Sequence, residues 1–375
     1  MTQSPTLRRL GAVVAAILGV LVVVGLMSTR FAQRPAVPAS TPGASLNADY
    51  CPPPAGVPLL YVKDPSHPSW LIGFDWSGQP LGTVKLDPAI GSAGMAPDGQ
   101  SFAVGFGAKG GTGEILDRLG QPVQGVGGAI PGSALPIWAD DSQHTGGIAF
   151  DPQTLTSNLV TLAPGQAVKS VAVLGHDQSL PPSFRIASYS FRSDEAIVVR
   201  SVNIWPSELL AVQLSSGKVT SLSTYATPEL LANVVASKDS TLIAENSSQS
   251  VVPQQGQTAP STIIRRVSDQ SVVIKLAPTI GVLAFNSDDS LVLLNTTPWA
   301  GGTPTAMSII DLKSGQELCN YNGPGMFGNA IGQPAGRDFA IYVRKPAVED
   351  PLTDVTIVHV DGTVSAFPRR YEPAW

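Results

Sequence analysis

The side chains best suited to chemistry in this sequence are four histidines, two cysteines and a repeated aspartate. His67, His144, His176 and His359 are scattered, and no Gly-x-Ser-x-Gly nucleophile elbow accompanies them. Residues of a nucleophilic triad can nevertheless meet in space from distant positions. The pattern favours exposed histidines in loops, and it indicates no catalytic set, no metal site and no cofactor.

The two cysteines, Cys51 and Cys319, lie 268 positions apart and lack the short spacing of a metal site. Outside the cytoplasm such a pair favours a disulfide. Closing a loop of this length would contribute roughly 4 to 5 kcal/mol in the chain-entropy model, less any strain in the folded state. Two independent thiols are the alternative, because the cysteines fall in the first and sixth units of the repeat described below.

Aspartate recurs at the fourth position of a short turn motif, at intervals of 43 to 53 residues. The copies run from Met95 to Asp98, Trp138 to Asp141, Phe191 to Asp194, Ala236 to Asp239 and Phe285 to Asp288, with a weaker form from Gln333 to Gly336. An Asp carboxylate accepts hydrogen bonds from the amides of its own turn. One turn per repeat would space the carboxylates too widely to share an ion, so we expect them to stabilise turns.

A glycine-rich segment, from Gly105 to Gly110, matches the dinucleotide fingerprint G-x-G-x-x-G. That fingerprint works only where a helix N-terminus follows and faces the pyrophosphate. Here the strand-like run from Glu114 to Leu116 follows instead. We therefore expect a loop that binds no nucleotide.

One complete repeat lies in residues 281–321. Four apolar runs of strand length alternate there with turns of Asp, Ser, Asn and Gly, which predicts four antiparallel strands. A four-stranded sheet of about 40 residues is the size of one blade of a β-propeller. The repeats therefore predict an all-β fold.

The number of blades follows from a second marker, a tight outer hairpin that appears seven times. The hairpins lie at 75–78, 117–120, 163–165, 215–217, 268–270, 313–315 and 361–362. The first unit shows only three strands, and residues 371–375 are expected to supply the fourth, which would close the ring. We predict a seven-bladed β-propeller over residues 59–375, or six blades if residues 139–174 form a long excursion.

The inner turns, written as Ala96-Pro-Asp-Gly99 and its relatives, resemble the repeats of TolB-like and WD40-like bacterial propellers. The resemblance covers residues 59–375, although the Gly-His and Trp-Asp signatures of true WD40 repeats are missing from it. It implies a propeller fold and a binding or scaffolding role, with scattered enzymes among such families.

The N-terminal part has a different composition. Residues 1–9 form a short N-terminus, 10–27 are uncharged and apolar, and 28–58 are rich in Pro, Ala and Ser. At 1.5 Å per residue the apolar run spans about 27 Å, close to the hydrocarbon thickness of a bilayer. We predict one transmembrane helix and a semi-extended tether, with a cytoplasmic N-terminus and an extracytoplasmic propeller. A cleaved secretory signal is the alternative.

The charge balance argues against nucleic acid as a partner. The chain has a net charge of −5, and residues 35–375 carry 19 bases against 28 acids. A nucleic-acid binder needs a basic stripe, which the sequence lacks.

The candidate binding residues lie in or beside loops that join the second and third strands of each unit. These residues are His67, Trp70, Trp205 and Trp299. Loops of unequal length that carry Trp on a rigid ring commonly build a recognition surface. The alternative is that each Trp simply caps the interface between two blades.

Three functions are compatible with these features. A membrane-tethered, extracytoplasmic module that binds a protein or glycan is favoured over an enzyme. The alternatives are a hydrolase or lyase with its site at the channel mouth, and an accessory subunit of a membrane complex. In the last case the small residues Gly11, Ala15 and Gly19 would pack the anchor helix against partners.

Overall fold

The structure is a computed structural model. It describes residues 60–373 apart from 87–89, 107–112, 118–119, 122, 124–136, 152, 164–165, 177–182, 203–204, 226–230, 248–260, 278–279, 297–304, 324–325, 335, 345–352 and 369. The chain divides into two compact units, Met1–Ala48 and Asp49–Trp375. No helix in the described ranges is long and apolar enough to cross a membrane. The predicted segments 1–9, 10–27 and 28–58 lie outside them.

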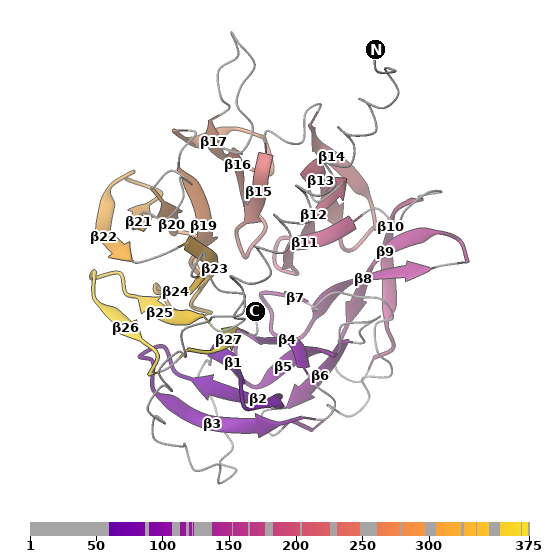
Figure 1. Cartoon of the computed structure of the whole chain (residues 1–375). Helices are drawn as coiled ribbons and strands as arrows, with labels where there is room; N and C mark the ends of the chain where they lie inside the picture. Colours follow the sequence, from indigo (N-terminus) through magenta and orange to yellow (C-terminus); the bar gives the residue numbers. More distant parts are fainter. Residues whose placement is uncertain are drawn as a thin grey trace, which may run out of the picture. The chain divides into compact units, whose positions relative to one another are not determined.

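The described strands form seven sheets, which we number as blades 1 to 7 along the chain (Figure 1). Blade 1 contains β27 (Glu372–Pro373), β1 (Leu60–Asp64), β2 (His67–Phe74) and β3 (Pro80–Lys85). Blade 2 contains β4 (Ile90–Met95), β5 (Ser101–Phe106) and β6 (Gly113–Asp117), and blade 3 contains β7 (Ile137–Trp138), β8 (Thr145–Asp151), β9 (Thr156–Leu162) and β10 (Lys169–His176). All pairings between neighbouring strands within these blades are antiparallel.

Blades 4 to 7 repeat the same order of strands. Blade 4 contains β11 (Ser183–Ser190), β12 (Glu195–Val202), β13 (Trp205–Gln213) and β14 (Val219–Thr224), and blade 5 contains β15 (Leu231–Ala236), β16 (Leu242–Ser247), β17 (Thr262–Arg266) and β18 (Val272–Leu276). Blade 6 contains β19 (Gly281–Phe285), β20 (Leu291–Asn295), β21 (Thr305–Asp311) and β22 (Glu317–Gly323), and blade 7 contains β23 (Met326–Gly332), β24 (Phe339–Arg344), β25 (Asp354–Val358) and β26 (Val364–Ala366). The fold is an all-β, seven-bladed β-propeller.

The ring closes between the two ends of the described chain, as the sequence predicts. β27 pairs with β1, with Val62 opposite Pro373 and Lys63 opposite Glu372. The buried ring of Tyr371 lies edge-on to Phe74, with 5.3 Å between the ring centroids. The six-bladed alternative is wrong, because residues 139–174 belong to a full sheet rather than to an excursion.

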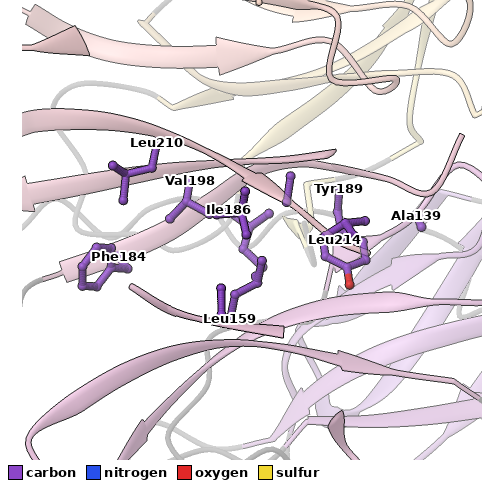
Figure 2. Close-up of a cluster of buried hydrophobic side chains, with 11 residues drawn as sticks. Ala139, Leu159, Phe184, Ile186, Tyr189, Val198, Leu210 and Leu214 are labelled. Carbon is purple, nitrogen blue, oxygen red and sulfur yellow. The ribbon is translucent and has the colours of Figure 1, made fainter. Parts of the chain in front are cut away.

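The hydrophobic core lies between blades. The cluster in Figure 2 joins Leu159 of blade 3 to Phe184, Ile186 and Val198 of blade 4, and each of the other clusters likewise contains residues of two blades. A single blade cannot cover its own apolar faces, so stacking around the ring is what buries them.

Antiparallel order sends the turns to two opposite ends of the ring. Turns between first and second strands share one end with those between third and fourth strands, and we call this end the turn face. The first-to-second turns that the structure describes lie at 96–100, 139–144, 191–194, 237–241, 286–290 and, apart from residue 335, 333–338. Connections between second and third strands leave at the other end, which we call the loop face.

The aspartates of these turns mostly act as the sequence predicts. Asp98 accepts a hydrogen bond from the amide of Gln100 at 2.9 Å, and Asp141, Asp239 and Asp288 each accept from amides of their own turns. Asp194 does not. Its carboxylate instead accepts from the amide and hydroxyl of Ser215 in the outer hairpin of blade 4, so its expected role as a cap of its own turn is wrong.

Candidate functional site

A cavity of about 360 Å³ opens where the inner strands reach the turn face, and we call it the mouth cavity. Its walls come from blades 2 to 7. Lining residues include Met95, Trp138, Tyr189, Ala236, Phe285 and Gly332. Each of these six is the inner-strand residue that pairs with the beginning of the second strand of its blade. The repeat therefore builds the cavity by placing one residue per blade at the same level.

The aromatic part of the wall is held in place by close packing. The indole Nε1 of Trp138 donates a 2.8 Å hydrogen bond to the carbonyl oxygen of Gly94 in the neighbouring blade. Tyr189 lies over Gly146, where a Cβ atom would come within 2.5 Å of the tyrosine ring. The absence of a side chain at Gly146 thus allows Tyr189 to lie at the wall, and the cavity is preformed.

Lys238 is the one charged residue among those that line the mouth cavity. Its Nζ lies 3.4 Å from the carbonyl oxygen of Pro334, two blades away. Burial lowers the pKa of Lys238, while the negative charge of Asp140 opposes that effect. The cavity therefore combines apolar walls with a single, partly desolvated cation at its rim.

Asp289 joins blade 6 to blade 5 beside this cation. Its two carboxylate oxygens accept hydrogen bonds from the amides of Lys238 and Asp239, at 3.1 and 3.3 Å. Burial, reinforced by the neighbouring carboxyl of Asp239, raises the pKa of Asp289 to about 8. At neutral pH this side chain therefore mostly carries a proton.

Similar links run between other neighbouring turns of the turn face. Asp140 accepts hydrogen bonds from the hydroxyl of Ser190 and the amide of Phe191, both at 2.9 Å. Ser287 donates to the carbonyl oxygen of Gly336 at 2.9 Å. Because each link crosses from one blade to the next, the turns around the mouth cavity hold one another in place. A rigid rim with few reactive groups is suited to holding a ligand.

His67 and Trp70, two of the predicted binding residues, come together at the start of β2. Their rings stack with centroids 4.1 Å apart, and Lys85 Nζ lies 4.4 Å from the centroid of the Trp70 ring. His67 also contacts Asp64, with 3.4 Å between Nδ1 and Oδ2. Trp70 is therefore in contact with residues of its own blade, and its role in binding stays a prediction.

The other predicted residues are only partly described. Trp205 begins β13, but its side chain lies outside the described part of the chain, as does all of Trp299. Cys319 lies in β22, where burial raises the pKa of its thiol, and Cys51 lies outside the described residues. The shared binding surface and the disulfide therefore stay predictions.

Two features of the structure are not evident from the sequence. The mouth cavity is one, because the residues that form it are apolar and look like core. The other is a set of three side chains in blade 7, where His359 Nδ1 lies 2.8 Å from Asp338 Oδ2 and Nε2 lies 2.9 Å from Ser365 Oγ. The described residues hold no group of three or more His, Cys, Asp or Glu that could bind a metal ion.

No protein-family model and no curated protein matches this sequence. Similar solved structures include a prolyl endopeptidase (TM-score 0.53, 11% identity, covering 84% of this chain and 50% of that one) and an oligogalacturonate lyase in complex with manganese (TM-score 0.51, 12% identity, covering 82% and 84%). TolB from Acinetobacter baumannii is also similar (TM-score 0.43, 17% identity, covering 71% and 63%). At such identities these likenesses concern the fold alone, and the number of blades rests on the strand pairing of this chain.

Proposed function

We propose that this protein is a membrane-tethered, extracytoplasmic binding module, and that the mouth cavity receives an apolar side chain of a protein partner. The observation that carries the proposal is the cavity itself, a preformed hollow of about 360 Å³ at the end of the inner strands. Binding sites are usually concave and mostly apolar, with a few polar groups that fix orientation.

The lining favours a protein over a glycan. Most of the wall is formed by Ala, Val, Leu, Ile and aromatic side chains, whereas a sugar would need many hydrogen-bonding partners to replace its water. Lys238 would orient the ligand by binding a carbonyl or carboxylate beside the apolar group. A glycan remains the alternative ligand.

The tether and location rest on the sequence. The apolar run 10–27 is long enough to span a bilayer, and 28–58 would hold the propeller away from it. We expect the full chain to stay in the membrane fraction after an alkaline carbonate wash, which strips peripheral proteins. Release into the supernatant would contradict the anchor.

The cavity can be tested by filling it. The full chain is extracted in mild detergent, its partners are identified by mass spectrometry, and capture is compared between variants. Ala236→Phe places a larger side chain in the cavity and should abolish capture of the specific partner. Val272→Phe lies on β18 of the same blade at a site that is 56% exposed, so it should leave capture unchanged.

A second pair of variants separates this site from the loop face. If Trp205→Ala and Trp299→Ala abolish capture while Ala236→Phe does not, the partner binds at the loop face and the cavity proposal is wrong. If the propeller copurifies only as part of a constant complex, irrespective of all these changes, the accessory-subunit alternative gains support.

A further inference from the structure

We propose that Ser365 is an activated nucleophile, and that the side of blade 7 that carries it hydrolyses small carboxylic esters. This activity would be separate from ligand binding at the mouth cavity. It would use a serine, a histidine and an aspartate that come from three neighbouring strands or strand ends.

The three side chains are arranged as in a nucleophilic relay. Asp338 Oδ2 lies 2.8 Å from His359 Nδ1, and His359 Nε2 lies 2.9 Å from Ser365 Oγ. The second oxygen of Asp338 accepts from the amide of Val360 at 3.2 Å. A carboxylate that accepts the Nδ1 proton leaves Nε2 free to take the proton of the serine.

The repeat provides an internal comparison, because equivalent positions in other blades differ in chemistry. His359 makes the same two backbone hydrogen bonds around its turn as Asp75 and Asp117 make around theirs. Those aspartates accept hydrogen bonds from amides of their own turns, a role that Asp361 takes in blade 7. The turn is therefore capped without His359, whose ring faces Asp338 and Ser365 instead.

The other two members also depart from the repeat. Six residues after Asp75 and Asp117 stand the apolar Leu81 and Val123, where Ser365 stands after His359. The residue equivalent to Asp338 is identified by its backbone bond across the first turn. It is Ser101, His144, Leu242 or Leu291 in other blades, so none of these is a carboxylate. All three residues that differ from the repeat, Asp338, His359 and Ser365, contact one another. The propeller fold does not require these residue types at these positions.

Ser365 is also placed where a substrate can reach it. β26 is the outermost strand of the described sheet, and Ser365 is partly exposed. Phe367 donates its amide to Val355, so the alternation of the antiparallel ladder turns the amide of Ala366 away from β25. That amide is the donor we assign to the developing oxyanion. Gly78 of blade 1 lies beside it, since a Cβ there would be in van der Waals contact, 3.7 Å from the Cβ of Ser365, so this glycine forms one wall of the site.

The reaction proceeds in two balanced steps. Ser365 Oγ bonds to the acyl carbon of the ester as its proton passes to His359 Nε2, and the ester C–O bond breaks as the leaving alcohol takes that proton. Water then attacks the acyl-serine, gives a proton to His359 and releases the carboxylic acid as the proton returns to Ser365. Because the serine lies on an open edge rather than in a deep cavity, we expect small, unbranched acyl groups.

The test uses the full chain in detergent with p-nitrophenyl acetate and, separately, a fluorophosphonate probe. We expect release of p-nitrophenol, and a covalent adduct that peptide mass spectrometry assigns to Ser365. Ser365→Ala should remove the adduct. His359→Gln and Asp338→Asn should slow acylation by about 100-fold or more, the usual contribution of a positioned base.

The matched control is Ser215→Ala. Ser215 occupies an outer hairpin of blade 4 and bonds directly to Asp194, without a histidine, so its removal should leave acylation unchanged. An equal rate in Ser365→Ala, or in a His359→Gln variant with unchanged thermal unfolding, would refute the proposal. If His359→Gln does not fold, the site of labelling in the wild type decides: a fluorophosphonate adduct on a serine other than Ser365, or no adduct at all, would overturn the idea.

Discussion

Asp239 and Asp289 lie side by side on the turn face, yet their surroundings shift their pKa values in opposite directions. Hydrogen bonds, led by that of the Thr241 hydroxyl, outweigh burial and hold the pKa of Asp239 below its ordinary value. Burial and the neighbouring Asp239 raise the pKa of Asp289 to about 8. Near neutral pH this pair of carboxyls between blades 5 and 6 therefore holds one proton, which is bound to Asp289, while Asp239 is ionised.

This arrangement predicts that stability falls with rising pH. A carboxyl whose pKa is raised on folding binds its proton more tightly in the folded state, so its stabilising effect is complete below its ordinary pKa of 3.8 and is lost as pH rises to about 8. The slope should be on the order of 1 kcal/mol per pH unit at most. Urea unfolding of the wild type across this range should show the decline, and Asp289→Asn should flatten it.

Asp269→Asn is the control for that measurement. Asp269 is fully exposed, and hydrogen bonds from Ser271 lower its pKa, so it loses its proton at lower pH than Asp289 does. The decline should persist in this variant. Equal slopes in Asp289→Asn and the wild type would show that Asp289 does not hold the shared proton.

At the scale of single elements, strands bounded by local turn chemistry could be predicted from sequence. Blade 6 is the clearest case, because β19 to β22 are apolar runs separated by turns whose Asp, Ser and Gly residues bond to their own backbone. β27, with two residues, has no such signal of its own. It was predicted from the need to close the ring.

The turn of blade 4 shows where a motif misleads. If Asp194 is aligned with the turn aspartates of the other blades, Phe191 aligns with Trp138 and Phe285. The strand register instead places Tyr189 at the same level as Trp138 and Phe285. Asp194 is therefore two positions beyond the equivalent of Asp98, and Phe191 lies at the surface. The uneven spacing of the aspartates indicates this offset, since 53 residues separate Asp141 from Asp194 and only 45 separate Asp194 from Asp239.

The candidate sites were harder to predict than the strands. The aromatic wall residues Trp138, Tyr189 and Phe285 look like core, and only the register reveals that they stand at one level around a channel. His359 and Asp338 are 21 positions apart, and their contact depends on β24 and β25 pairing with Phe339 opposite Val358. The spacing of residues in the sequence does not by itself show which residues of two strands lie opposite each other.

For the whole molecule, the decisive feature is that the blades depend on one another. Clusters of buried side chains lie between blades rather than within them, and the turn face adds polar links across several seams. A cavity walled by six blades keeps its shape only while the ring is closed. Ligand binding at the mouth should therefore be sensitive to the distant seam where β27 meets β1.

Removal of residues 372–375 tests this dependence. The truncation takes away two ladder pairs of β1, each worth about 1 kcal/mol, and should lower the free energy of unfolding by on the order of 2 kcal/mol. It also leaves β1 as an open edge that can pair with another molecule. Size-exclusion chromatography should then show self-association that increases with protein concentration. Val272→Ser, an exposed change on β18, should affect neither property, and a truncated chain that stays monomeric and equally stable would mean that β27 does not close the ring.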